Sequence, residues 1–288
     1  MAPSEPIIGA PLAAAELPDA EALVREAGWN QVAADWEIFR ALGTVHAARV
    51  AKRVVATAAT LPYGQFAWIS MVLVAGDQRR RNLGTQLLKR CIDALRNQDR
   101  VPVLDATPAG RPLYRALGFE ETWGYHRLAR GNAQPMRDDT NAACDTIVCP
   151  IADADWPALC AYDAVCFGAD RSALLQRMRG RLPAAELVAK RHGRTAGFLL
   201  GRNGRTASQI GPLVAEDNDV ARALLTRALP AIEGPVYIDF ADSKTALRAW
   251  LAECGFSAQR PLTRMLLGRS SGFDDETRTF AVVGPEFG

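Results

Sequence analysis

The chain has 288 residues, 49% hydrophobic and 23% charged, a balance typical of a globular protein long enough for two domains. Its net charge of +2 excludes the basic excess of a dedicated nucleic-acid binder. We therefore expect no nucleic-acid partner. Every apolar run is shorter than the roughly 20 residues of a membrane span, so we also expect no association with a membrane. Six cysteines without C-x-x-C spacing, and no secretory signal, predict reduced thiols, no metal and a cytoplasmic protein.

The sequence pattern of the first half predicts a pair of helices, then strands, then further helices and strands in alternation. A Gly-Trp-Asn segment separates the first two helices, and apolar residues at helical spacing mark the third. The helices are expected at about 17–26, 32–42, 83–95 and 108–117, and the strands at 44–52, 54–61, 66–74, 101–104, 119–123 and 125–128.

The second half repeats this order of elements. Leu213-Val214-Ala215 echoes Leu73-Val74-Ala75, and Cys254-Gly255-Phe256 echoes Leu117-Gly118-Phe119. A polar stretch without periodicity separates the halves. The chain therefore reads as two diverged copies of one α/β unit. The predicted boundaries are a first domain at 1–130, a linker at 131–146, a second domain at 147–269, and a polar tail at 270–288 with one apolar run at 280–283.

A basic loop joins the strand at 66–74 to the helix at 83–95. The first amides of a helix lack intrahelical partners and, with the helix dipole, attract anions. Gly84 lets a pyrophosphate approach the backbone, and Asn82 tolerates a positive φ. Arg79, Arg80 and Arg81 add positive charge. This loop is the predicted binding site for a diphosphate.

The segment Arg79-Arg80-Arg81-Asn82-Leu83-Gly84 resembles the acetyl-CoA signature Q/R-x-x-G-x-G/A of the GNAT superfamily. About 30 residues later, Leu113-Tyr114-Arg115-Ala116-Leu117-Gly118-Phe119 resembles that family's Y-x-x-x-G-F element, and the two together are more specific than one glycine motif. Asn82 departs from the pattern, which has a glycine there. The resemblance implies an α/β (α+β) fold of tandem GNAT-like domains, each a mixed, mainly antiparallel twisted sheet flanked by helices.

The resemblance also implies roles for individual residues. Tyr114 matches the tyrosine whose hydroxyl protonates the leaving thiolate of coenzyme A, a charge that exists only late in the reaction. Backbone groups of one strand would pair with the pantetheine arm, and the basic loop would hold the pyrophosphate. The implied cofactor-binding residues are Met71, Val72, Leu73 and Val74 on the strand, and Arg79, Arg80, Arg81, Asn82, Leu83, Gly84 and Thr85 in the loop and helix.

The second copy lacks these features. Three residues are missing where the phosphate loop would be, and the acidic run Glu216-Asp217-Asn218-Asp219 would repel pyrophosphate. Leu251 stands where the first copy has Tyr114. The second copy is therefore expected to be degenerate and to serve the acceptor side. The candidate acceptor contacts are Trp29 in the first copy, and Asp163, Asp170 and Arg171 in the second.

These features predict an enzyme that moves an acetyl group from acetyl-CoA, its co-substrate, to a primary amine of a small molecule by direct attack. Two alternatives stay open: a non-catalytic acyl-CoA sensor, and an acetyltransferase for protein lysines or N-termini. The intact Tyr114 favours catalysis, because binding alone does not need it. The general base, the acyl group, the acceptor and a homodimeric state are left open by the sequence.

Overall fold

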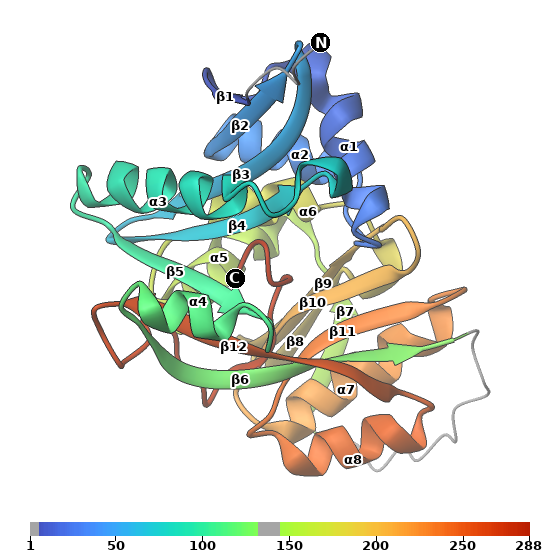
Figure 1. Cartoon of the computed structure of the whole chain (residues 1–288). Helices are drawn as coiled ribbons and strands as arrows, with labels where there is room; N and C mark the ends of the chain where they lie inside the picture. The colour runs from blue at the N-terminus through green and yellow to red at the C-terminus, as the bar shows by residue number, and fades with distance from the viewer. Residues whose placement is uncertain (1–5, 132–144) are drawn as a thin grey trace. The chain divides into compact units, whose positions relative to one another are not determined.

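The structure is a computed structural model that describes residues 6–131 and 145–288 (Figure 1). Contacts between Cα atoms divide the chain into two compact units. Unit 1 comprises the chain up to Leu104 together with Phe287, and unit 2 comprises residues 105–286 together with Gly288. Most of the predicted linker at 131–146 lies outside the described residues. No helix among the described residues has the length and apolar character needed to cross a membrane.

Unit 1 is a sheet covered by helices on both faces. Its strands follow the order β1-β2-β3-β4-β5; the first four are antiparallel neighbours, and β5 runs parallel to β4. Helix α3 packs on one face of the sheet, over β3 and β4, and α2 packs on the other, over β2 and β3 (Figure 1). The elements are β1 (Ile7–Ile8), α1 (Leu17–Glu26), α2 (Ala33–Leu42), β2 (Thr44–Val50), β3 (Arg53–Tyr63), β4 (Phe66–Val74), α3 (Leu83–Arg96) and β5 (Val101–Ala106), with short 3₁₀ turns at Ala14–Glu16 and Gly76–Gln78.

Burial explains why these segments form the elements predicted for them. Residues 54–61 of β3 are buried without alternation, as expected for a strand covered on both faces. Helix α3 buries a single stripe, which fixes the face it turns to the sheet. The stripe consists of Leu83, Leu87, Leu88, Cys91, Ile92 and Leu95.

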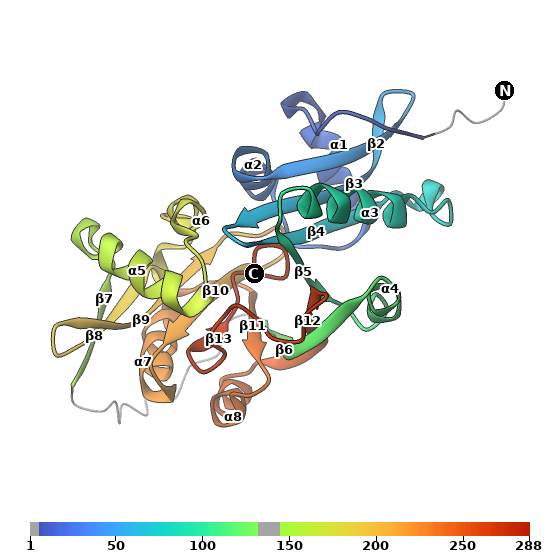
Figure 2. The ribbon, with the colours of Figure 1, turned by 90° about the vertical axis from the view of Figure 1, so that its left-hand side faces the viewer.

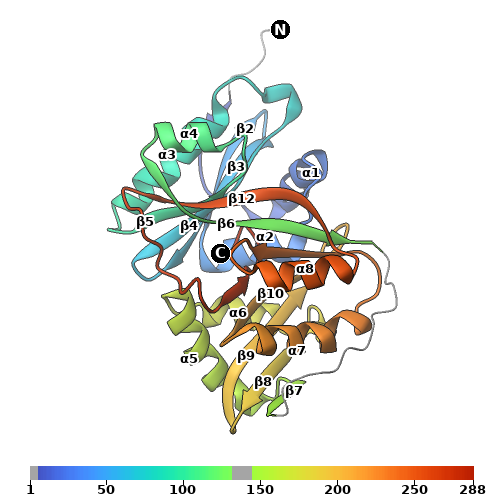
Figure 3. The same ribbon diagram turned by 90° about the horizontal axis from the view of Figure 1, so that it is seen from below.

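Unit 2 contains a sheet with the strand order β12-β6-β11-β13-β10-β9-β8-β7. Helices α7 and α8 lie on one of its faces (Figure 3). The elements are α4 (Arg111–Ala116), β6 (Phe119–Arg130), β7 (Thr146–Pro150), α5 (Trp156–Phe167), α6 (Ser172–Met178), β8 (Leu187–Arg191), β9 (Arg194–Arg202), β10 (Ser208–Ala215), α7 (Asn218–Ala228), β11 (Val236–Ala241), α8 (Thr245–Glu253), β12 (Ser257–Leu267) and β13 (Thr279–Ala281), with 3₁₀ turns at Asp153–Asp155, Pro183–Ala185 and Leu229–Ala231.

Strand β6 belongs to the first copy in sequence, yet it pairs along its length with β11 and β12 of the second copy. The sequence predicted a break between two strands near Gly124, and this was wrong because β6 is continuous through that residue. A glycine suits this position of the strand because the Asp242 carboxylate approaches it closely: an added Cβ would lie 3.0 Å from Asp242 Oδ2. The compact units and the two sequence copies therefore have different boundaries.

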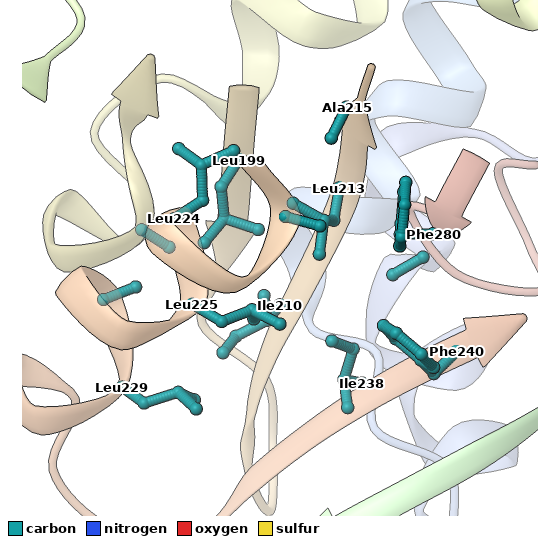
Figure 4. Close-up of a cluster of buried hydrophobic side chains, with 14 of the residues drawn as sticks. Leu199, Ile210, Leu213, Ala215, Leu224, Leu225, Leu229, Ile238, Phe240 and Phe280 are labelled. Atoms are coloured by element: carbon teal, nitrogen blue, oxygen red, sulfur yellow. The ribbon is translucent and has the colours of Figure 1, made fainter. Parts of the chain in front are cut away.

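The last apolar run of the chain is a sheet strand. In β13, Ala281 pairs with Leu213 of β10 and with Phe240 of β11, both antiparallel (Figure 2). The Phe280 side chain is 1% exposed and joins the main hydrophobic cluster of unit 2 (Figure 4). The same cluster includes Leu213, Leu224 and other side chains from β9, β10, β11, α7 and α8. The run at 280–283 is thus an integral part of the core.

Replacing Phe280 with alanine should destabilise the protein by about 3–5 kcal/mol, the usual cost of deleting a buried aromatic ring. The deletion also removes the ring that lies 4.3 Å from the Lys244 ammonium. Urea denaturation followed by circular dichroism measures the loss. Val165→Ala is the matched control, because Val165 is 69% exposed and its truncation should change stability by no more than about 0.5 kcal/mol. Equal effects of the two substitutions would contradict a core role for β13.

Candidate functional site

Strand β4 contains a bulge in the segment predicted to bind the pantetheine arm. Between the pairs Ala59↔Ser70 and Thr57↔Leu73, β4 carries one residue more than β3. The extra residue is accommodated at Met71, whose φ is 52°. The buried Thr57 hydroxyl donates a 2.8 Å hydrogen bond to the Met71 carbonyl oxygen and fixes the bulge. The Thr57 hydroxyl therefore fixes the backbone conformation of β4 within the segment predicted to pair with the pantetheine arm.

Beyond its first three residues, β4 loses its parallel neighbour. Register pairs join Phe66, Ala67 and Trp68 to Val101, Pro102 and Val103, and among the described residues β4 and β5 share no further pairs (Figure 1). Among the described residues, the edge of β4 from Ile69 to Val74 has no strand partner on the side from which β5 has diverged, although the Arg79 guanidinium donates to the Val74 carbonyl oxygen at 3.4 Å. Such an edge can accept an extended ligand as an additional strand.

The loop after β4 adopts two left-handed residues in close succession. Arg80 has φ 62° and Asn82 has φ 63°. Asn82 thus takes a left-handed conformation, which asparagine adopts more readily than most residues other than glycine. The loop is anchored at its start, where Gly76 N donates to Glu26 Oε1 at 2.6 Å. These conformations turn the chain from β4 directly into the first turn of α3.

The N-terminus of α3 is open and surrounded by positive charge. Asn82 is its N-cap residue, and the Asn82 side chain caps none of the described amides of α3. The Cβ that Gly84 lacks would lie 3.5 Å from Val74 Cγ2, so the first helical turn lies directly against the end of β4. Arg80 and Arg81 are exposed beside it. Uncapped amides, a helix dipole and guanidinium groups are together suited to binding an anion.

The equivalent opening in the second copy is filled. Strands β10 and β11 are also parallel for only three pairs, from Ser208↔Val236 to Ile210↔Ile238. Past that point β13 pairs with both strands, and Val282 N donates to Asp239 O at 3.1 Å. Because the chain's own strand occupies this opening, a pantetheine arm has no unpaired edge to join there.

The N-terminus of α7, the counterpart of α3, is also filled. Asp217 is its N-cap, and its Oδ1 accepts a 2.9 Å hydrogen bond from Val220 N. The same carboxylate pairs with Arg191. Burial alone would raise the pKa of Asp217, but the Arg191 guanidinium and the backbone amide outweigh it and hold that pKa below its ordinary value. A permanent internal carboxylate thus stands where the first copy leaves its amides open.

Tyr114 lies in α4 of unit 2, half-buried, with its ring edge-on to Phe119 at a centroid distance of 6.0 Å. Gly110 provides space for the ring, since a Cβ there would lie 2.8 Å from Tyr114 Cε2. Burial raises the pKa of the Tyr114 phenol. The hydroxyl therefore keeps its proton throughout the neutral range, as a proton donor must.

The candidate acceptor contacts are dispersed. Trp29 is half-buried between α1 and α2. Both oxygens of the buried Asp163 accept hydrogen bonds from Arg171, at 2.8 and 2.9 Å. The exposed Asp170 accepts one from Ser172 N at 2.8 Å. In unit 2 the structure thus joins Asp163 and Arg171 to each other, and Asp170 to the start of α6.

Sequence reasoning missed Thr57 and β13. Thr57 lies within an apolar strand and gives no local signal of its bond to Met71. The run at 280–283 was visible, but its pairing partners lie far away in sequence. No group of three or more His, Cys, Asp or Glu side chains within the described residues is arranged to hold a metal ion.

Two family models match the chain, one in each sequence copy. The model described as "Acetyltransferase (GNAT) family" matches residues 14–119, and the model described as "Acetyltransferase (GNAT) domain" matches residues 159–281. The chain belongs to the GNAT superfamily. This tandem GNAT protein is thereby assigned to the N-acetyltransferases, and acetyl transfer is its chemistry.

Known proteins share this organisation. The uncharacterized N-acetyltransferase YitH of Bacillus subtilis (strain 168) is 28% identical over 194 residues, which cover 67% of this chain and 67% of YitH. A candidate acetyltransferase from Pyrococcus horikoshii superposes with a TM-score of 0.76 at 20% identity, covering 100% of this chain and 97% of the other. A tandem GNAT protein from the clavulanic acid biosynthesis pathway superposes at 0.65 and 15% identity, over 93% and 100%. The two solved structures establish the mixed, mainly antiparallel tandem fold.

Replacing Thr57 with valine keeps the shape of the side chain but leaves the buried Met71 carbonyl without its donor. The expected loss of stability is about 1–3 kcal/mol. Thr60→Val is the matched control, because the Thr60 hydroxyl reaches its nearest acceptor, Thr44 O, only at 3.5 Å and contributes little. Urea unfolding of both variants measures the difference. If Thr57→Val were as stable as Thr60→Val, the hydroxyl would not be what holds the bulge.

Proposed function

We propose that this GNAT protein binds one acetyl-CoA per chain, at the first copy, and transfers its acetyl group to a primary amine of a small molecule. The observation that carries the proposal is a contrast between the copies. The first has an open strand edge leading to an uncapped helix N-terminus, whereas β13 and Asp217 fill both places in the second. The cofactor therefore has one place to bind.

The residues of unit 1 fit the two chemically distinct parts of coenzyme A. Backbone groups of Met71, Val72, Leu73 and Val74 pair with the amides of the pantetheine arm as an added strand. The amides of Leu83, Gly84 and Thr85 bind the diphosphate at the N-terminus of α3. Arg79, Arg80 and Arg81 add charge, and Asn82 supplies the left-handed turn that lets the backbone approach.

The acetyl group moves by direct attack of the neutral amine on the thioester carbon. The new C–N bond forms, the C–S bond breaks, and the departing thiolate takes the phenolic proton of Tyr114. Because burial raises the pKa of that phenol, Tyr114 enters each cycle with its proton in place. The amine proton leaves through water, since β4 carries no carboxylate. The second copy, which needs no cofactor, is then available to the acceptor. The candidate acceptor contacts are Trp29 in the first copy, and Asp163, Asp170 and Arg171 in the second.

Replacing Asn82 with aspartate would place at the N-cap of α3 the acid that Asp217 provides in α7. Repulsion between this carboxylate and the diphosphate should weaken coenzyme A binding at least about tenfold. Isothermal titration calorimetry measures the affinity and the stoichiometry, which should be one per chain.

Asn97→Asp is the matched control, since Asn97 is the exposed C-cap of the same helix and the change in charge is identical. It should leave the affinity within about twofold, because surface charges this distant are screened. Equal affinities for the two variants, or two molecules bound per chain, would rule out the single site at α3.

Removing the hydroxyl of Tyr114 separates catalysis from sensing. Tyr114→Phe should reduce kcat about 10²–10⁴-fold, the usual worth of a positioned proton donor, while coenzyme A affinity stays unchanged. Thioester consumption with a panel of amines measures the rate, and calorimetry measures the affinity. If Tyr114→Phe kept full turnover, Tyr114 would not be the proton donor. If the wild type bound acetyl-CoA and acetylated no amine, the sensor alternative would be favoured.

A further inference from the structure

A row of charged and polar side chains crosses the face of the unit 2 sheet opposite α7 and α8. Asp239 of β11 lies directly across from Arg127 of β6, which lies directly across from Arg260 of β12. On the other side of β11, Gln209 of β10 donates to Asp239 Oδ2 at 3.0 Å. Glu286 completes the set from the segment after β13. We refer to these five residues as the polar row.

One charge in the polar row, that of Arg260, has no ion-pair partner in the part of the chain that the structure describes. Arg127 holds both oxygens of Asp239 through hydrogen bonds of 2.9 and 2.7 Å, so this pair is internally neutral. Glu286 forms an ion pair with Arg202. Among the residues that the structure describes, no carboxylate forms an ion pair with Arg260, and its buried Nε has no hydrogen-bond partner. The polar row thus contains one guanidinium group without an ion-pair partner among the described residues.

Leaving this guanidinium without such a partner is unfavourable. Arg127 and Arg260 are like charges at directly opposed positions on neighbouring strands, which destabilises a sheet. Burial and the charge of Arg127 lower the pKa of Arg260, and the charges of Asp239 and Glu286, which act in the opposite direction, do not offset them. An anionic group bound to Arg260 would relieve both effects. Arg260 is only partly buried, so such a group has access to it.

The polar row also contains buried acceptors that lack donors. Glu286, 3% exposed, has no hydrogen-bond partner for Oε2 among the described residues, and Gln209, fully buried, has none for Oε1. The charge of Glu286 acts on Arg260 and on Arg127, which places the acid near both. Unpaired buried acceptors require N–H or O–H donors. The row therefore lacks an anion at Arg260 and a donor at Glu286 and Gln209.

We infer that the polar row binds a small amine that also carries a carboxylate, an amino acid in the broad sense. Its carboxylate binds Arg260, and its nitrogen donates to the free oxygens of Glu286 and Gln209. Identifying this molecule as the acetyl acceptor rests on the proposed function, whereas its binding to the polar row does not.

The test begins with the full chain free of coenzyme A. Differential scanning fluorimetry with the proteinogenic amino acids, ornithine and β-alanine at millimolar concentration should give a rise in Tm with at least one of them. Acetate at the same concentration should not reproduce that rise. The absence of any hit, or an equal rise with acetate, would overturn the inference.

Calorimetry with the amino acid found and with its carboxamide then tests the carboxylate contact. The wild type should bind the carboxamide about 10–100-fold more weakly than the amino acid. Arg260→Gln should bind the amino acid about 10–100-fold more weakly than the wild type does, and should discriminate little between the two ligands. Arg260→Lys should recover part of the affinity, because it keeps the charge.

Arg227→Gln is the matched control, since Arg227 is an exposed arginine of α7 in the same unit. It should bind both ligands as the wild type does. A merely structural role for Arg260 would weaken both ligands equally and keep the wild-type discrimination, an outcome that contradicts the inference. Loss of coenzyme A binding in the Asn82→Asp experiment leaves these measurements unaffected, so the two proposals fail separately.

Discussion

The organisation of each sequence copy depends on a parallel strand pair that stops after three residues. In β4 with β5, and in β10 with β11, the strands pair at their beginnings and then separate. Separation exposes the backbone groups of a central strand, and buried backbone groups must find partners. Each copy therefore has a gap between its two parallel strands in which backbone groups need partners. A ligand can supply those partners, or another strand of the chain can, and in the second case the core is closed.

The two copies meet this requirement in different ways. The first keeps its opening free, fixes the β4 bulge through the Thr57 hydroxyl, and leaves the amides of α3 uncapped. The second completes its sheet with β13 and caps α7 with Asp217. In the second copy a carboxylate and a strand of the chain itself thus occupy the places that the proposed function assigns in the first copy to a diphosphate and a pantetheine arm. The second copy therefore satisfies with its own residues the groups that the first copy leaves open.

Local features of the chain could be read from its sequence, and distant pairings could not. The apolar stripe of α3, the turn at Asn82 and the repeated order of elements depend on neighbouring residues, and their predictions agree with the structure. The role of β13 depends on partners in β10 and β11 that lie far earlier in the sequence, and the continuity of β6 depends on strands from the other copy. Asp163 illustrates the same limit, because only the fold reveals that Arg171 binds both of its oxygens. Sequence patterns report which face of an element is buried, but not which element covers it.

The position of β6 bears on how this gene can evolve. The strand is encoded with the first copy but lies between β11 and β12 of the second. A reading frame cut between the copies would leave β11 and β12 each with a bare edge, and bare edges recruit foreign strands into aggregates. Strand β6 therefore ties the duplicated halves together, because neither half alone contains both sides of its pairing with β11 and β12.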